Sequence, residues 1–555
     1  MKKVLLILMV VVLVVSAFAS CAPTPVEPSK APTEKPVETP EPTPEPGPIV
    51  FNWNIGADPK TIDPGLNGAS DGGDVINQTF EGLVREKSGV VQPGIAESWE
   101  TSEDGLTVTF HLRESNWSDG SPLTANDFVY SWLRAMDPAT ASEYSWIWEY
   151  THVVGAQKFA EGEGTKEEVG VKALDDKTLE VKLESPTDYF VSLMAFYHFL
   201  PVKQASVEAG ADGTWASNPD LAVCNGPFRL TKYTIGEGLV LERNPEYWDA
   251  GVVGIDIING FFIDDQATAF QAYQNGELDF LPEVPPANVP TLMAEDPNFY
   301  VFPLLGTYYY NFNLKKEIWS DARVRKAISM AINRELICEA LASGEVPAAG
   351  FIPPGFKDDK GNDFFATAGT YGLATDDSTV AAAQALLAEA GYPNGEGFPE
   401  FTIMYNTGQG HEMVATMVQE QLKTNLGLKT KLENQEWAVF QDTRKEGKYD
   451  VARGGWLTDF MDPIGMLGIF VPGNAYNDPK YDSADFVAAI NAAAAATDPA
   501  EHFKYLYEAQ EIFMNDMPVV PVYHYTDKCL VSEKLVDWDR SVLGTIDFST
   551  ATIVK

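Results

Sequence analysis

The chain has 555 residues, 45% of them hydrophobic and 12% aromatic, which is ample for a large buried core divided among two or three domains. Its formal net charge of −41 argues against nucleic acids and anionic membrane surfaces as partners, because like charges repel. Its four cysteines are too few for a disulfide framework.

The amino terminus has the form of an export signal. Lys2 and Lys3 precede twelve apolar residues, Val4–Val15, and small residues follow as far as Cys21, which predicts a signal peptide over residues 1–20. The apolar run is too short for a transmembrane helix, which needs about 20 residues. The run Ala19-Ser20-Cys21 resembles the bacterial lipobox, so we expect Cys21 to carry a lipid. The protein would then be exported and anchored to the outer face of the cell membrane or in the periplasm, with ordinary secretion as the alternative.

Residues 21–48 are predicted to be a lipidated spacer. Residues 22–48 contain ten prolines, five glutamates and no aromatic residue, a composition that cannot bury apolar surface and favours extended polyproline II. If the cysteine at the start of this spacer is acylated, three cysteines remain, and they allow at most one bridge. They are Cys224, Cys338 and Cys529.

Helical and strand periodicities alternate through the rest of the chain. Strict apolar–polar alternation predicts strands at 106–113 and 179–183. Helical patterns start at Asp321 and run over 380–390, where Gly391 follows as a stop signal.

The order of elements in the second half predicts a parallel sheet. A strand over 401–406, a helix over 411–425 and a second strand over 428–433 follow one another, which is the order of a βαβ unit. The fold class is therefore α/β.

Catalytic motifs are not visible in the sequence. His411 and Glu412 begin like a zinc-protease helix, but the second histidine that the metal needs one turn later is missing. The chain also has no Cys-x-x-Cys, G-x-S-x-G, Walker or G-x-G-x-x-G element. We therefore expect a protein that is not an enzyme and that needs no cofactor and no metal.

One segment, 449–463, combines features of a ligand site. Arg453, Trp456, Asp459 and Asp462 crowd a glycine-rich stretch between apolar runs. An extended backbone there can pair with a peptide as an added strand, while a carboxylate takes the ammonium of the ligand and an arginine its carboxylate. A strand end with a satisfied salt bridge is the alternative, and on residue types alone it is the favoured interpretation.

Several ordered runs resemble one family, the oligopeptide-binding proteins of bacterial ABC importers, which form the peptide/nickel family 5 of extracellular solute-binding proteins. The resemblance covers nearly everything after Ile49. The runs that carry it are Phe80-Glu81-Gly82-Leu83, Pro93-Gly94-Ile95-Ala96-Glu97-Ser98-Trp99, Phe110-His111-Leu112-Arg113, Trp117-Ser118-Asp119-Gly120, Asp127-Phe128-Val129-Tyr130-Ser131-Trp132, Asn225-Gly226-Pro227-Phe228, Thr307-Tyr308-Tyr309-Tyr310, Asn434-Gln435-Glu436-Trp437 and Asp442-Thr443-Arg444.

The resemblance implies a two-lobed fold of the periplasmic-binding-protein type (type II, cluster C) with an extra inserted domain. In this sequence lobe I would comprise 49–80, 203–305 and 527–555, the inserted domain 81–202, and lobe II 306–526. It also implies that short peptides are the ligand, that permease subunits of an ABC transporter are the partner, and that the protein is a monomer which touches the membrane only through its lipid anchor and binds no nucleic acid.

The resemblance also assigns roles to residues of the site. Asp459 would clamp the free amino group of the peptide, Arg453 would meet the carboxylate of a shorter peptide and His411 that of a longer one. The main chain of Gly455 and Leu457 would pair with the ligand. The further contacts would come from Ser70 by its main chain, from Tyr144 by its hydroxyl or ring, and from Trp437, Trp456, Tyr309 and Tyr525 as the lining of side-chain pockets.

The sequence departs from the family pattern at three places. Gly306 and Leu457 occupy positions where some relatives carry a disulfide, so that bridge is absent. Glu283 falls near a ligand-contacting asparagine, and no basic residue stands over 340–344, where some relatives have one for the peptide carboxyl end.

Two other functions stay open at this point. The same fold binds oligosaccharides in some relatives by stacking sugars on tryptophan, and a surface hydrolase or adhesin would belong to another class altogether. Loss of affinity on acetylating the peptide amine would favour the amine clamp, and detectable peptide turnover would favour a hydrolase.

Overall fold

The computed structural model describes residues 47–88, 90–210 and 213–554, and the chain from Pro48 onward forms one compact unit. The predicted signal peptide, Cys21 and nearly all of the predicted spacer lie outside the described residues. No helix of the described part combines the length and the apolar character that crossing a membrane requires.

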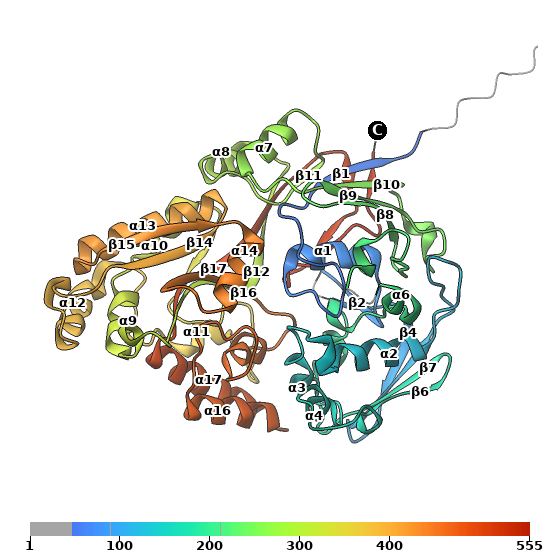
Figure 1. Ribbon diagram of the computed structural model, residues 1–555, viewed down its shortest axis with the longest axis horizontal. Helices are drawn as coiled ribbons and strands as arrows, with labels where there is room; N and C mark the ends of the chain where they lie inside the picture. The colour runs from blue at the N-terminus through green and yellow to red at the C-terminus, as the bar shows by residue number, and fades with distance from the viewer. Residues whose placement is uncertain (1–46, 89, 211–212, 555) are drawn as a thin grey trace, which may run out of the picture. The chain divides into compact units, whose positions relative to one another are not determined.

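A mixed sheet of eleven strands runs through this unit (Figure 1). In spatial order its main path is β15 (Thr430–Gln435), β14 (Phe401–Asn406), β16 (Val451–Leu457), β12 (Phe299–Phe312), β17 (Val519–Val531), β11 (Phe280–Leu281), β1 (Val50–Asn54), β10 (Ile257–Phe261), β9 (Gly238–Arg243) and β8 (Phe228–Thr234), and β13 (Val346–Pro347) pairs with β17.

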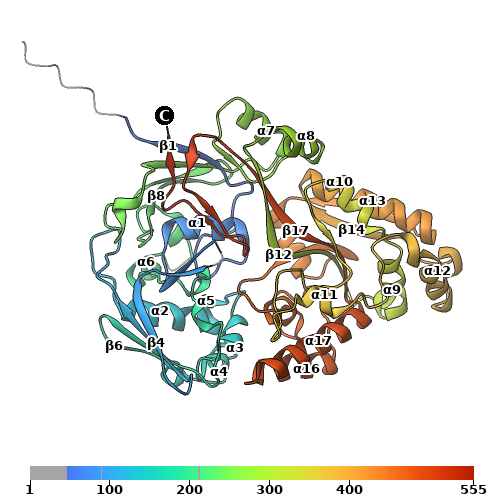
Figure 2. The same cartoon turned by 180° about the vertical axis from the view of Figure 1, so that it is seen from behind.

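Two long strands join the two halves of this sheet. β12 and β17 pair antiparallel, and their register shifts between Pro303 and Thr307 and again between Tyr308 and Tyr309. One end of the pair borders β16 and β14, and the other borders β11 and β1; both views show the pair passing between these groups (Figures 1 and 2). The predicted lobe boundaries near 305 and 526 fall inside these two strands, and the exact boundaries stay a prediction.

The predicted βαβ unit is confirmed. β14 and β15 pair in parallel and are connected by α13 (Gln409–Leu426). Gly427 ends this helix with a left-handed φ of 69°, a conformation that glycine adopts without steric cost. The predicted helices at 321 and 380 are also present, as α9 (Ala322–Met330), which Asp321 caps at Arg323 N, and as α12 (Val380–Glu389).

A second, four-stranded antiparallel sheet lies in the region of the predicted insertion. Its order is β4 (Ala96–Thr101), β5 (Thr107–Leu112), β7 (Thr178–Lys182) and β6 (Val171–Asp175), so both strands predicted from alternation are confirmed. The helices of this region are α2 (Ala125–Met136), α3 (Ile147–Thr151), α4 (Ala156–Ala160) and α5 (Phe190–Leu193).

The remaining regular elements connect or cover these two sheets. The helices are α1 (Ser70–Thr79), α6 (Gln204–Ala209), α7 (Gln266–Gln274), α8 (Val289–Glu295), α10 (Arg334–Leu341), α11 (Phe364–Ala368), α14 (Trp437–Lys445), α15 (Ile464–Leu467), α16 (Ala484–Ala495) and α17 (Pro499–Asp516). The strands form three antiparallel pairs, β2 (Val84–Lys87) with β3 (Val90–Pro93), β18 (Leu535–Val536) with β21 (Thr552–Ile553), and β19 (Asp539–Arg540) with β20 (Ile546–Asp547).

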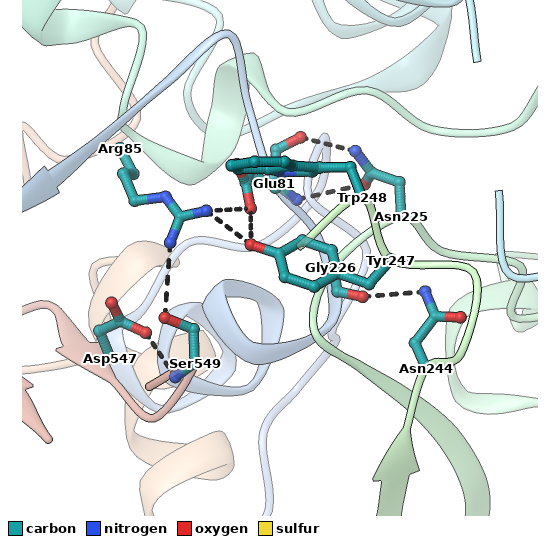
Figure 3. A network of polar contacts seen from close by, with 9 residues as sticks. All are labelled: Glu81, Arg85, Asn225, Gly226, Asn244, Tyr247, Trp248, Asp547 and Ser549. Carbon is teal, nitrogen blue, oxygen red and sulfur yellow. Dashed lines mark hydrogen bonds and ion pairs between the residues drawn. The ribbon is translucent and has the colours of Figure 1, made fainter. Parts of the chain in front are cut away.

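A buried polar network ties together segments that are far apart in the sequence (Figure 3). The Glu81 carboxylate accepts hydrogen bonds from Arg85 Nη2 at 2.7 Å, from Trp248 Nε1 at 3.0 Å and from the Tyr247 hydroxyl. Its backbone is held from the other side by Asn225, whose Nδ2 donates to the Glu81 carbonyl at 2.8 Å. Two of the runs that carry the family resemblance, around Glu81 and Asn225, therefore hold the fold together and contain none of the predicted ligand contacts.

Candidate functional site

The predicted recognition segment begins as β16, and part of one edge of this strand is open. β12 pairs with all of Val451–Leu457, whereas β14 pairs only with Val451 and Ala452. Asn313 N bonds to Asp450 O and Thr458 N to Leu305 O, so the even-numbered residues of β16 direct their main-chain groups to β12. The main-chain groups of Gly455 and Leu457 point the other way, where no strand of the described chain pairs with them.

Two glycines let side chains and backbone come close at this place. A Cβ on Gly455 would lie 2.3 Å from the Tyr525 hydroxyl, and one on Gly306 would lie 2.3 Å from Leu457 Cδ2. Gly306 and Leu457 are direct cross-strand neighbours, so the two positions noted for the absent disulfide do face each other. The three cysteines of the described chain, Cys224, Cys338 and Cys529, are all free, so the one bridge left open by the sequence is not formed.

Asp459 follows β16 and has an unusual environment for a carboxylate. Its Oδ1 accepts a hydrogen bond of 3.3 Å from the Tyr144 hydroxyl, while its Oδ2 is buried and has no partner among the described residues. Burial raises the pKa of Asp459 well above its ordinary value, and the hydrogen bond from Tyr144 lowers it only in part. A positive charge placed at Oδ2 would offset the free-energy cost of burying the ionised carboxylate.

Aromatic rings surround the Asp459 carboxylate. The Tyr144 ring is buried, 6.3 Å from the ring of Trp456 and 5.2 Å from that of Tyr476. Trp456 donates its indole N–H to the Gly465 carbonyl at 2.8 Å, which fixes the orientation of the ring. Tyr144 is therefore brought to Asp459 from a segment 315 residues away, and its ring lies near that of Trp456, which was also predicted from the sequence.

Arg453 lies on β16 as the second charged group of the site. Its Nη2 donates to the Tyr525 hydroxyl at 2.7 Å and its Nη1 to Asn406 Oδ1 at 3.5 Å, and its guanidinium carbon lies 5.0 Å from the centre of the Tyr308 ring. Its Nε is buried without a partner among the described residues. The residues that contact its guanidinium, Tyr525, Asn406 and Tyr308, are neutral, so the arginine is able to receive an anion.

His411 stands in the first turn of α13, with its ring 5.6 Å from that of Tyr308. Burial lowers the pKa of His411 well below its ordinary value, and the charges of Arg453 and Lys528 lower it further. The imidazole is therefore neutral near pH 7. Lys528 was not predicted from the sequence, because it lies far along the chain from 340–344. Its Nζ donates to Ser343 Oγ at 2.8 Å and to Glu345 at 3.1 Å.

The three remaining predicted residues, Tyr309, Trp437 and Ser70, differ in how far they are buried. Tyr309 packs its ring against Phe351 at 5.2 Å, on the face of β12 opposite to Tyr308. Trp437 is partly exposed at the start of α14, and Ser70 is exposed at the start of α1.

Asp462, at the end of the predicted segment, is a structural residue. Its Oδ2 lies 3.0 Å from His502 Nε2 and its Oδ1 accepts from Ile464 N at 2.9 Å. Burial alone would lower the pKa of His502, but the Asp462 carboxylate and the Ala493 carbonyl together raise it. For this one carboxylate the reading of a satisfied salt bridge is the correct one.

Comparisons with known proteins identify the family and the fold of the chain. Residues 90–478 match the family described as bacterial extracellular solute-binding proteins, family 5 Middle. The chain is 36% identical over 520 residues to the oligopeptide-binding protein OppA of Bacillus subtilis, covering 91% of this chain and 93% of that protein. The crystal structure of Haemophilus influenzae OppA in complex with the peptide RPPGFSPFR has a TM-score of 0.83 at 33% identity, covering 92% of this chain and 99% of that one. The predicted family resemblance, the two-lobed α/β fold and the expectation of a binding protein rather than an enzyme are confirmed.

Two structures of one relative allow the conformation of the described chain to be compared with an open and a second form. The Escherichia coli murein tripeptide binding protein MppA has a TM-score of 0.85 in one structure and 0.62 in its unliganded open form, each at 32% identity and 92% coverage of this chain, with 99% and 98% of the MppA chain covered. The described chain is therefore arranged unlike that open form. Contacts such as Tyr144 with Asp459 belong to this arrangement.

Proposed function

The chain belongs to the bacterial extracellular solute-binding proteins of family 5, and we propose that it captures short peptides outside the cytoplasm and delivers them to the permease subunits of an ABC importer. The names of its relatives, OppA and MppA, with their oligopeptide and murein tripeptide ligands, support this ligand class. Cys21 would anchor the protein through a lipid, and the proline-rich spacer would hold the binding unit away from the membrane.

Asp459 would bind the free amino group of the peptide. The observation that carries this proposal is the buried Oδ2 without a partner among the described residues, beside an Oδ1 that Tyr144 already holds. An ammonium at Oδ2 would supply the missing hydrogen bonds and neutralise a desolvated charge, which is the strongest kind of polar contact in a protein interior.

The backbone of the peptide would add to the open edge of β16. Gly455 and Leu457 offer main-chain donors and acceptors there, two residues apart, which is the spacing that one side of an added strand requires. Ser70, at the start of α1, would contact the peptide main chain from the other side.

The peptide carboxylate would meet Arg453 when the peptide is short and His411 when it is longer. Arg453 has a fixed guanidinium and a buried unpartnered Nε, and His411 would act as a neutral hydrogen-bond donor because its pKa is lowered. Side chains of the ligand would lie against the rings of Trp437, Trp456, Tyr309 and Tyr525.

Closure of two lobes would trap the peptide. Lobe I, the inserted domain and lobe II would have the boundaries predicted above, with β12 and β17 as the connecting strands. Lys445 forms an ion pair with Glu143, and the Tyr476 hydroxyl donates to the Gly68 carbonyl at 3.0 Å, so several contacts would break on opening. A ligand that contacts both lobes only in the closed form shifts the population toward that form.

Calorimetry with a tripeptide and its N-acetylated form tests the proposal. The free tripeptide is expected to bind and the acetylated one to lose most of its affinity, since acetylation removes the positive charge. Native mass spectrometry of the purified protein would identify any ligand carried along. Equal binding of both peptides would contradict the amine clamp, and a co-purified oligosaccharide would contradict the ligand class.

The raised pKa of Asp459 predicts that peptide binding releases protons. In the described arrangement burial holds the pKa of Asp459 above its ordinary value while no ligand is bound, and an ammonium at Oδ2 would lower it. Between these two pKa values a fraction of the protein must lose a proton to bind, so affinity rises with pH across this window until the peptide amine itself deprotonates near its pKa of about 8. Calorimetry in buffers of different ionisation enthalpy measures the proton release, which Asp459→Asn should abolish; an identical release in that variant would contradict the assignment.

A further inference from the structure

A second carboxylate with a buried oxygen, that of Asp71, acts on the same tyrosine as Asp459. Asp71 stands in the first turn of the ten-residue helix α1, and its Oδ2 is buried without a hydrogen-bond partner among the described residues. Burial raises its pKa to about 6, more than the nearby backbone N–H groups of α1 and the Trp437 indole lower it. None of the ligand contacts proposed above involves this carboxylate.

Ring packing connects Asp71 to Asp459. A Cβ on Gly73 of α1 would lie 2.8 Å from Tyr197 Cε1, and the Tyr197 ring lies 5.9 Å from that of Tyr144, whose hydroxyl holds Asp459. The charges of both Asp459 and Asp71 act on the Tyr197 hydroxyl and raise its pKa, after the larger effect of burial. The two unpartnered carboxylates are thus neighbours of one buried ring.

Trp437 reaches Asp71 from a distant segment of the chain. The tryptophan begins α14 and is partly exposed, and its side chain interacts with the Asp71 carboxylate strongly enough to lower its pKa. A carboxylate and an indole side by side are the two groups that bind a Lys or Arg side chain best, the first by ion pairing and the second by a cation–π contact.

No Lys or Arg side chain of the described residues forms an ion pair with Asp71. Lys60, which is near in sequence, pairs with Asp442 at 2.9 Å and lies 3.9 Å from Glu143. The charged side chains that interact with Asp71 are Asp58 and Asp74, both negative. The local field therefore favours a cation and disfavours an anion.

We propose that Asp71, with the Trp437 ring beside it, binds the cationic side chain of a basic residue in the captured peptide. This inference rests on the proposed function and narrows its ligand class to short peptides that contain Lys or Arg. An aspartate in the first turn of a helix also stabilises that helix through the dipole, so the test must report side-chain selectivity rather than stability alone.

Calorimetry with pairs of tripeptides tests the inference. Each pair carries either lysine or norleucine at one of the three positions and alanine elsewhere, so that its members differ only in the side-chain ammonium. In the wild-type protein the lysine peptide is expected to bind about tenfold to a hundredfold more tightly at one position. In Asp71→Asn this preference should fall to about twofold or less, and measurable binding of the norleucine peptide would show that the variant is folded.

Asp58→Asn is the matched control. It removes the same charge from the same neighbourhood, but both Asp58 oxygens are occupied, by the Tyr233 hydroxyl at 2.7 Å and by Gly236 N at 2.6 Å. The preference for lysine should survive in this variant. Its loss in Asp58→Asn to the same extent as in Asp71→Asn would overturn the assignment, because the general negative field and not Asp71 would then be responsible.

One measurement needs no variant. Wild-type protein mixed with equal amounts of the lysine and norleucine tripeptides should appear in native mass spectra almost entirely as the lysine complex. Equal occupancy by both peptides would overturn the inference and leave the proposed function intact. Failure of every tripeptide to bind would overturn the proposed function itself.

Discussion

Asp459→Asn is expected to weaken the binding of a free tripeptide by about 3–5 kcal/mol, the cost of leaving one member of a buried ion pair without its partner. This corresponds to an increase in Kd between about a hundredfold and a few thousandfold. The asparagine keeps the shape of the side chain and still accepts the Tyr144 hydroxyl at Oδ1, so the loss reports the charge at Oδ2. Calorimetry with one tripeptide measures it.

Asp462→Asn is the control for this prediction. It lies three residues later and removes the same charge, but its carboxylate already pairs with His502 and caps Ile464 N. We expect this variant to lose stability while its Kd for the tripeptide changes little. An unchanged Kd in Asp459→Asn, or an equal loss in both variants, would contradict the amine clamp.

Glu81→Ala is expected to lower the free energy of unfolding by about 3–5 kcal/mol, since it breaks a buried ion pair on one side. The Glu81 side chain is 5% exposed, and its removal would leave Arg85 Nη2, Trp248 Nε1 and the Tyr247 hydroxyl without their shared acceptor (Figure 3). Unmet buried hydrogen-bond donors add to the cost. Urea denaturation followed by tryptophan fluorescence measures the loss.

Glu103→Ala serves as the comparison for this network. Glu103 is exposed in the turn between β4 and β5, and surface substitutions of this kind change stability by about 0.5 kcal/mol or less. The double variant Glu81→Ala with Arg85→Ala should recover part of the loss, because no unpaired guanidinium is left behind. A loss below about 1 kcal/mol in Glu81→Ala alone would show that the network contributes little to the fold.

Much of the candidate site was predictable because short-range pattern and family resemblance pointed to one segment. Arg453, Gly455, Leu457 and Asp459 lie within seven residues, and a glycine-rich extended stretch with charges at its ends is visible in the printed sequence. Residue types did not distinguish a binding carboxylate from a paired one, and Asp462 shows why. Its partner His502 is 40 residues away, and only the folded chain brings the two within 3.0 Å.

Other residues escaped prediction because their surroundings come from several segments. Asp71 is one of many acidic residues in an acidic chain, and only its burial between α1, Tyr197 and Trp437 sets it apart. Lys528 is likewise an ordinary lysine in the sequence, placed beside Ser343 and Glu345 by the pairing of distant strands. No local sequence pattern distinguishes Asp71 or Lys528 from the other charged residues of the chain.

The sequence by itself determined the α/β class, the family and the location of the recognition segment, because alternation, helix stop signals and ordered motifs are local properties of the chain. The tertiary structure decided which of the charged groups in and around that segment are left without a partner. It gave Asp462 a histidine and left Asp459 and Asp71 each with a buried oxygen that no described residue satisfies. The reason is physical: a carboxylate becomes a binding group through desolvation and the absence of a counter-charge, and both depend on residues hundreds of positions away.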